Sequence, residues 1–119
     1  MNRAIAQSAD VEELGPGVQF QVQKDGRLWW AFIIRFRDEA RCYLNACAHV
    51  GLRLNADKDL FFDAANNLLC RAHGASYDAA DGKCKDGPCQ GYGLIPLAIR
   101  EENGNIFYED ETYQLANQS

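Results

Sequence analysis

The chain has 119 residues, of which 47% are hydrophobic and 24% charged, as is ordinary for one globular domain. The formal net charge of −5 argues against nucleic acid as a partner. Residues 1–10 have no continuous apolar core, and the most apolar run, residues 28–36, is too short to cross a bilayer. We therefore expect a cytoplasmic protein without a membrane segment, whose five cysteines are reduced thiols or metal ligands rather than disulfides.

The first apolar runs have the period of strands. Residues 20–44 predict a strand, a turn at Asp25-Gly26, a long strand and a third strand. One face of the long strand carries Leu28, Trp30, Phe32, Ile34 and Phe36. The opposite face is also partly apolar, so we expect both faces of this sheet to be covered.

Turn residues continue to separate short apolar runs in the rest of the chain. We predict turns at Asn66-Asn67, Asp81-Gly82 and Asn103-Gly104, with an alternating strand over residues 94–99 before the last of them. No stretch predicts a helix longer than two or three turns. The fold class is therefore all-β, built from many short antiparallel strands.

The chain has two histidines, and each follows a cysteine closely, as Cys47-Ala48-His49 and Cys70-Arg71-Ala72-His73. Two thiolates and two imidazoles can hold a tetrahedral zinc ion, or a two-iron cluster with both cysteines on one iron and both histidines on the other. Zinc fingers usually draw like ligands from one segment, whereas here both segments are mixed. A two-centre cluster explains the mixture, because each loop then supplies one ligand to each metal.

The spacing C-x-H, a gap over residues 50–69, then C-x-x-H resembles the Rieske motif. The likeness continues in "HGASYDAADGKCKDGPCQGYGL", where Tyr77, Gly82 and Gly87-Pro88 match an aromatic residue, a turn glycine and a Gly-Pro loop. It spans at least residues 17–108. The alternatives, a zinc site and a purely structural role for these residues, stay open at this point.

The resemblance implies a Rieske-type antiparallel β-sandwich forming a single domain over residues 1–119. Its basal part would comprise residues 1–42 and 93–119, and a cluster-binding subdomain, residues 43–92, would be inserted. The resemblance further implies one [2Fe–2S] cluster per chain, with Cys47, His49, Cys70 and His73 as its metal ligands. Tyr77 would donate a hydrogen bond to a ligand sulfur and so contribute to cofactor binding.

Neighbouring positions predict where the reduction potential lies. High-potential members of the family carry a disulfide between the ligand loops, but the matching positions here are Leu52 and Ala72. The serine that donates to a cluster sulfide is replaced by Ala75, with Ser76 displaced by one residue. We therefore expect a potential in the low-to-middle part of the Rieske range of roughly −150 to +300 mV.

Three cysteines fall outside the ligand pattern. We interpret Cys42, on a predicted strand, as a small buried apolar side chain. We interpret Cys84 and Cys89 as reduced packing thiols, with a redox-active pair as the alternative. In the segment between the ligand loops, we expect one of Phe61 and Phe62 to pack into the subdomain.

The function expected from this resemblance is that of a Rieske ferredoxin, which passes single electrons. Its partners would be a reductase and a terminal oxygenase or reductase, and we expect a monomer. Because no residues resemble a substrate site, we expect an electron carrier rather than a complete enzyme. The alternatives are the small subunit of a nitrite reductase and, from another class, a zinc-bound structural or interaction module.

Overall fold

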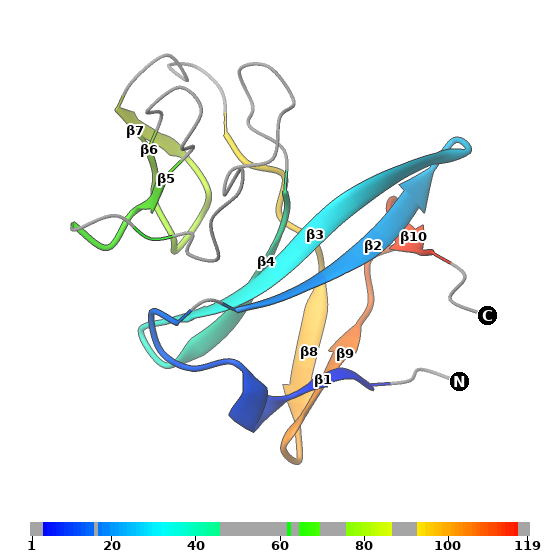
Figure 1. The fold of residues 1–119 in the computed structure, drawn as a ribbon, viewed down its shortest axis with the longest axis horizontal. Helices are drawn as coiled ribbons and strands as arrows, with labels where there is room; N and C mark the ends of the chain where they lie inside the picture. Colours follow the sequence, from blue (N-terminus) through cyan, green and yellow to red (C-terminus); the bar gives the residue numbers. More distant parts are fainter. Residues whose placement is uncertain are drawn as a thin grey trace.

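The computed structural model describes residues 4–15, 17–45, 62, 65–69, 76–86 and 93–116, which form three antiparallel sheets (Figure 1). The middle sheet has the order β10–β2–β3–β4, with β2 at Val18–Lys24, β3 at Arg27–Phe36, β4 at Glu39–Leu44 and β10 at Gln114–Leu115. The second has the order β1–β9–β8, with β1 at Ala4–Gln7, β8 at Ile99–Glu102 and β9 at Asn105–Tyr108. The third has the order β5–β6–β7, with β5 at Leu68–Leu69, β6 at Ser76–Tyr77 and β7 at Cys84–Asp86.

The described ranges contain no α-helix, only the 3-10 helix η1 at Ser8–Asp10. The prediction of an all-β fold is therefore confirmed. No helix in these ranges is long and apolar enough to cross a membrane.

Residues with positive φ angles form the turns that the sequence predicts. Asp25 and Gly26 have φ angles of 52° and 79° and join β2 to β3, and Asn103 and Gly104 have 53° and 79° and join β8 to β9. Positive φ at both central residues is the geometry of a two-residue hairpin turn whose twist suits the flanking strands. These two hairpins are thus determined by local chemistry.

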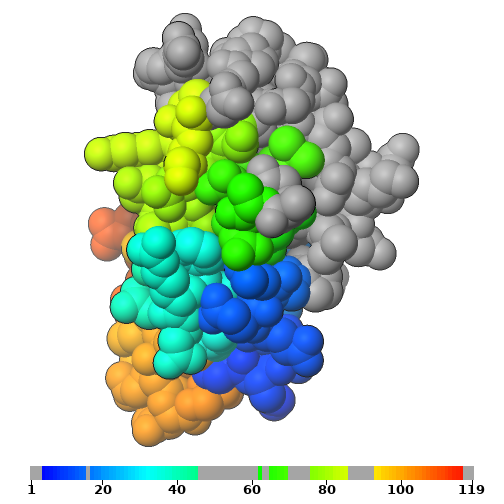
Figure 2. Space-filling model, turned by 90° about the vertical axis from the view of Figure 1, so that its left-hand side faces the viewer, coloured from blue at the N-terminus to red at the C-terminus, as the bar shows by residue number. Residues whose placement is uncertain are grey.

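The middle sheet is covered on both faces, because side chains alternate along β3 (Figure 1). Ala31 and Ile33 face the β1–β9–β8 sheet, and pack in one core with Ile106. Phe32 and Ile34 face the other way, toward the β5–β6–β7 sheet. Figure 2 shows the green and yellow-green residues of β5–β7 stacked directly on the cyan residues of the middle sheet.

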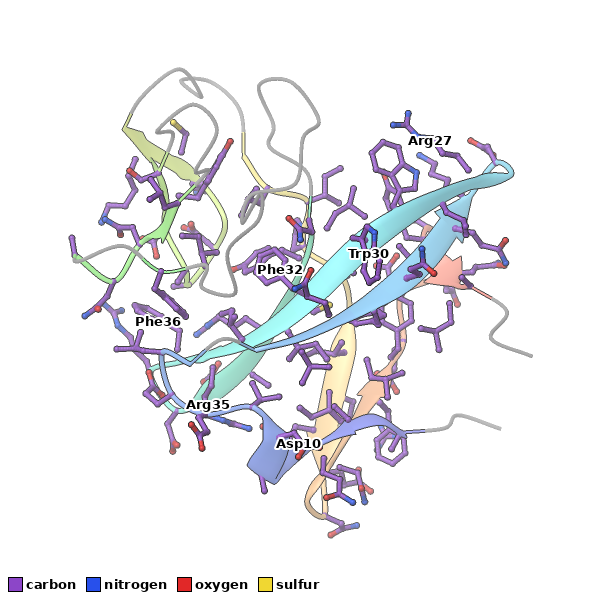
Figure 3. The ribbon with its side chains drawn as sticks, viewed as in Figure 1. Asp10, Arg27, Trp30, Phe32, Arg35 and Phe36 are labelled. Atoms are coloured by element: carbon purple, nitrogen blue, oxygen red, sulfur yellow. The ribbon has the colours of Figure 1, made fainter. Side chains whose placement is uncertain are left out.

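The prediction that β3 presents one uniform apolar face holds only along part of the strand. Phe32 and Ile34 are fully buried, whereas Leu28 and Trp30 are 56% and 36% exposed. Figure 3 shows Trp30 farther along β3 from the β5–β6–β7 sheet than Phe32 and Phe36. The periodicity is correct, but the covering sheet is shorter than β3.

The predicted strand over residues 94–99 is wrong in extent, since β8 begins only at Ile99. Gly93 and Pro96 each form an isolated bridge, to Lys83 and to Tyr43 respectively. Proline has no N–H to donate to a sheet ladder, so a continuous strand through residue 96 is unfavourable. This segment instead runs beside β4, where Leu44 N–H donates to the Ile95 carbonyl and Leu97 N–H donates to the Cys42 carbonyl.

Candidate cofactor site: a hairpin fixed to the middle sheet

All four predicted metal ligands, Cys47, His49, Cys70 and His73, lie outside the described residues, as does Cys89. Two of the described strands end close to them in the sequence. β4 ends at Leu44, three residues before Cys47, and β5 ends at Leu69, directly before Cys70. Within the described ranges no group of three or more His, Cys, Asp or Glu side chains could hold a metal ion. The described part of the site is therefore its support, formed by β4, β5 and β6.

Tyr77, the fifth predicted site residue, lies in β6 and is fully buried. Its neighbours in the core include Phe32, Phe62 and Leu68, which exclude water from this side of the site. Burial of Phe62 confirms that one of the two phenylalanines between the ligand loops packs inward, while Phe61 lies outside the described residues. A buried phenol usually has a hydrogen-bond partner.

Tyr77 is part of a hairpin formed by β6, a turn at residues 78–83 and β7, which we call the Tyr77 hairpin (residues 76–86). Asp78 N–H donates to the Lys83 carbonyl (2.8 Å), and Gly82 N–H donates to the Asp78 carbonyl (2.7 Å). Gly82 has a φ angle of 79°, as expected for the predicted Asp81-Gly82 turn. The turn is thus closed by its own backbone.

Two side chains from β4 hold this turn against the middle sheet. The Tyr43 hydroxyl donates to the Ala79 carbonyl (2.8 Å), and Arg41 Nη1 donates to the Ala80 carbonyl (2.8 Å). Burial raises the pKa of Tyr43 to about 12, so the phenol keeps its proton and remains a donor at neutral pH. The hairpin that carries Tyr77 is therefore attached to the basal strands by two hydrogen bonds.

Gly82 also makes a close approach that requires glycine. A Cβ at this position would lie 2.9 Å from Cε1 of Tyr43 and 3.3 Å from the Cβ of Leu94. The same residue's carbonyl accepts a hydrogen bond from Leu94 N–H (2.8 Å). The turn consequently packs between Tyr43 and the segment that leads into β8.

Sequence reasoning missed the role of Tyr43. A usable signal existed, because a tyrosine on a strand of a sheet that is covered on both faces is expected to be buried, and a buried hydroxyl usually has a hydrogen-bond partner. The distance along the chain between Tyr43 and Ala79 hid the identity of that acceptor. Only the packing of β4 against the hairpin brings them together.

The two cysteines in the described part of the chain are in different chemical states. Cys42 is a free thiol with 4% exposure, and burial raises its pKa, which confirms the interpretation as an apolar core residue. Cys84 is disulfide-bonded. The prediction that Cys84 is a reduced thiol is therefore wrong. That prediction used the expected compartment, whereas the bond depends on a second cysteine lying within the short reach of a disulfide.

Comparison with known proteins identifies the fold. The sequence model of the Rieske [2Fe-2S] domain matches residues 4–100. A ferredoxin from Sphingomonas yanoikuyae B1 superposes with a TM-score of 0.69 at 22% identity, covering 93% of this chain and 100% of its own. The ferredoxin of carbazole 1,9a-dioxygenase from Nocardioides aromaticivorans IC177 superposes with a TM-score of 0.66 at 18% identity, covering 93% and 99%.

A further match is the terminal oxygenase of carbazole 1,9a-dioxygenase from Nocardioides aromaticivorans IC177. Its TM-score is 0.65 at 22% identity, and the match covers 99% of this chain but 31% of the oxygenase. No curated protein matches the sequence. The structural likenesses show a common fold, and the family model covers most of the chain.

The chain therefore belongs to the Rieske [2Fe–2S] domain family. The cofactor of this family is a [2Fe–2S] cluster, as the sequence predicts. The predicted fold class, an all-β Rieske-type sandwich, is confirmed as well.

Proposed function

We propose that this chain is a one-electron carrier whose cluster is held by Cys47, His49, Cys70 and His73. The number and spacing of the possible metal ligands support this proposal. A Rieske centre needs two histidines and two cysteines, and the chain has two histidines in all. Each histidine follows a cysteine within three residues, and both segments come shortly after the ends of β4 and β5.

The state of the other cysteines supports the same assignment. Cys42 lies buried in the core on the far face of the middle sheet, and its raised thiol pKa disfavours the thiolate that binds metal. Cys84 is occupied by a disulfide. Neither is available as a ligand, so the donor set fits the cluster.

A bound [2Fe–2S] cluster supplies a one-electron couple at a potential that its surroundings adjust. The chain's own residues would set those surroundings. The buried side chains around Tyr77 exclude water, and the Tyr77 hydroxyl would donate to the sulfur of a ligand cysteine. Tyr43 and Arg41 would hold the Tyr77 hairpin in place.

We further propose a division of the domain into a basal part, residues 1–42 and 93–119, and a cluster-binding subdomain, residues 43–92. The sheet order supports it. β5, β6 and β7 pair only with one another among the named strands, while β1–β4 and β8–β10 form the other two sheets. β4 lies at the boundary and contacts both parts.

The proposed electron donor is a reductase and the proposed acceptor is a terminal oxygenase. Similar structures support this choice, since one match at a TM-score of 0.63 is a complex of reduced oxygenase and oxidized ferredoxin in carbazole 1,9a-dioxygenase. This match covers 93% of the present chain and 94% of the matched one. We expect the carrier to act as a monomer.

Neither alternative is favoured by the comparisons. The similar structures described above are ferredoxins and an oxygenase, so they do not favour a nitrite reductase subunit. A zinc module conflicts with the family's cofactor.

The proposed location is the cytoplasm. Its support is that the two cysteine ligands of the proposed cluster and Cys42 are needed without a disulfide, a state that reducing compartments maintain. A disulfide is unusual in such a compartment. Fractionation of cells that express the protein from its own gene tests this location, and recovery outside the cytoplasm would contradict it.

The experiment that tests the function is purification under anaerobic conditions, followed by metal analysis and EPR. We expect a reddish-brown protein with two irons per chain and a rhombic signal on reduction. Cys47→Ser, His49→Ala, Cys70→Ser and His73→Ala should each lose that signal, whereas the control Cys42→Ala should retain it. A colourless protein that contains zinc would contradict the proposal.

Electron transfer itself needs a kinetic test. The reduced protein is mixed with a candidate terminal oxygenase, and its reoxidation is followed by visible absorption in a single turnover. We expect reoxidation that becomes faster with oxygenase concentration. Reoxidation at the rate seen with buffer alone would rule out that oxygenase as the acceptor.

A further inference from the structure

The turn between β3 and β4 is held by an acidic side chain from the N-terminal segment. Its two central residues, Arg37 and Asp38, have φ angles of 54° and 67°, which are unfavourable for residues other than glycine. The Glu13 carboxylate accepts from both of their amides, from Arg37 N–H at Oε2 (2.7 Å) and from Asp38 N–H at Oε1 (2.8 Å). Water could satisfy these amides too, but only a charged acceptor fixed to the protein also holds the turn in place.

The segment that carries Glu13 is itself fixed to β3. Glu13 forms an isolated parallel bridge with Arg35, and Leu14 N–H donates to the Arg35 carbonyl (3.0 Å). The Arg35 side chain donates from Nε to the Val11 carbonyl (2.7 Å) and from Nη1 to the Asp38 carbonyl (3.2 Å). Asp38 is therefore held through its N–H by Glu13 and through its carbonyl by Arg35.

Phe36, the residue before this turn, contacts the sheet that carries Tyr77. Figure 3 shows Phe36 and Arg35 at the same end of β3. The Phe36 ring stacks on the Phe62 ring, with centroids 6.4 Å apart and planes 20° apart. Phe62 forms an isolated bridge with Leu68, and Leu68 is the register partner of Tyr77 in the β5–β6 ladder. A continuous series of contacts thus leads from the β3–β4 turn to Tyr77.

We infer that Glu13 is a positioning residue for the cofactor site. By fixing the β3–β4 turn, Glu13 holds Phe36 against Phe62 and so determines where the β5–β6 ladder places Tyr77. Phe62 and Tyr77 are buried in one core, and a close-packed core transmits a displacement at its edge. The inference rests on the proposed function, in which the Tyr77 hydroxyl donates to a ligand sulfur.

This support acts on a different element from the hydrogen bonds that β4 supplies. Tyr43 and Arg41 hold the turn between β6 and β7, whereas Phe62 bridges to Leu68 in β5. Tyr77 lies between the two attachments, because β6 pairs with both β5 and β7. Its position therefore depends on β4 from one side and on the β3–β4 turn from the other.

Glu13→Gln tests the inference, because an amide keeps one acceptor oxygen and turns an NH₂ donor toward the second amide. Glu12→Gln is the matched control. Glu12 is also exposed, and its carbonyl, which the substitution keeps, accepts from Gly15 N–H (3.0 Å). Both variants lose one negative charge, but only Glu13→Gln should displace Tyr77 and weaken its hydrogen bond. We therefore expect a lower midpoint potential in Glu13→Gln than in Glu12→Gln.

A double-mutant cycle with Phe36→Leu tests the route of the effect. If Glu13 acts through Phe36, adding Glu13→Gln to Phe36→Leu should leave the potential equal to that of Phe36→Leu with Glu12→Gln. A difference as large as in the wild-type background would contradict the inference, because Glu13 would then act without Phe36.

Amide hydrogen exchange locates the effect without relying on the redox couple. Glu13→Gln should speed exchange in β5 and β6, while β9, in the sheet on the other face, should exchange as in the wild type. Glu12→Gln should change neither region. Exchange that rises equally in β9 would show that Glu13 acts on global stability, which would overturn its role as a positioning residue.

The outcomes separate this inference from the proposed function. Equal potentials in Glu13→Gln and Glu12→Gln, with the EPR signal kept in both, would overturn the inference and leave the electron-carrier function intact. A wild-type protein without that EPR signal would overturn the proposed function instead. The exchange comparison would then still decide whether Glu13 positions β5 and β6.

Discussion

The hydroxyl of Tyr43 in β4 donates a hydrogen bond of 2.8 Å to the carbonyl of Ala79 in the turn of the Tyr77 hairpin. Tyr43 is 2% exposed, so this bond forms in the core rather than at the surface. It connects the middle sheet to the turn two residues after Tyr77. The position of Tyr77 relative to the basal strands therefore depends on Tyr43.

Tyr43→Phe should lower the free energy of unfolding by about 1–3 kcal/mol, because the Ala79 carbonyl is left buried without this donor. Chemical denaturation with two probes measures the change. Tyr108→Phe is the matched control, since the Tyr108 hydroxyl donates to the Tyr113 carbonyl in the core on the other face of the middle sheet. Both variants should lose stability, but only Tyr43→Phe should shift the midpoint potential. Equal potentials in the two variants would show that Tyr43 does not position Tyr77.

Gly82→Ala should be more destabilising than Gly104→Ala. Both glycines have a φ angle of 79°, which costs an alanine roughly 1–2 kcal/mol. A Cβ at position 82 would in addition approach Tyr43 Cε1 to 2.9 Å, whereas one at position 104 meets no atom within 4 Å. The difference between the two denaturation midpoints measures the cost of the contact between the added Cβ and Tyr43. If the two variants unfold alike, the turn is not packed against Tyr43 in solution.

Tyr77→Phe should lower the midpoint potential while the cluster remains bound. Loss of a hydrogen bond to a ligand sulfur makes the oxidised form relatively more stable. Protein-film voltammetry measures the shift, which should exceed that of Tyr43→Phe because Tyr43 acts only through the hairpin.

The wild-type protein should itself titrate in the low-to-middle part of the range of roughly −150 to +300 mV. A midpoint potential near the top of that range would contradict the prediction that Ala72, which cannot form the disulfide, and Ala75, which replaces the serine donor, keep the potential lower.

Glu101→Gln should remove stability near neutral pH but not in acid. Arg35 Nη2 lies 2.6 Å from Glu101 Oε2, and this hydrogen bond holds the Glu101 pKa below its ordinary value of 4.5. Figure 3 shows Arg35 close to the η1 segment that carries Asp10. A carboxylate with a lowered pKa contributes stability above its unfolded pKa and loses it as the pH falls through the folded one.

Unfolding free energies of wild type and Glu101→Gln should thus differ by up to about 1 kcal/mol at pH 7 and converge below pH 4.5. Glu102→Gln is the control, because Glu102 pairs with the more exposed Arg100. A difference that persists in strong acid would show that the substitution acts through packing rather than through the ion pair.

Local chemistry made much of the fold predictable from the sequence. Asp25-Gly26 and Asn103-Gly104 predict their hairpins because few residues tolerate two consecutive positive φ angles. The period of β3 predicts two apolar faces. The ligand set was recognisable because two Cys–His segments with this spacing are chemically unusual, and their assignment stays a proposal since these segments lie outside the described residues.

The sequence by itself thus determined the strand periods, the turns and the family to which the chain belongs. The tertiary structure alone decided that β3 extends beyond its covering sheet, that the Tyr43 hydroxyl donates to the Ala79 carbonyl, and that Cys84 is disulfide-bonded. These features depend on pairs of groups that are brought together by packing between sheets or by the course of a loop. Composition and periodicity describe each segment alone, so they carry no information about which distant group completes a hydrogen bond or a disulfide.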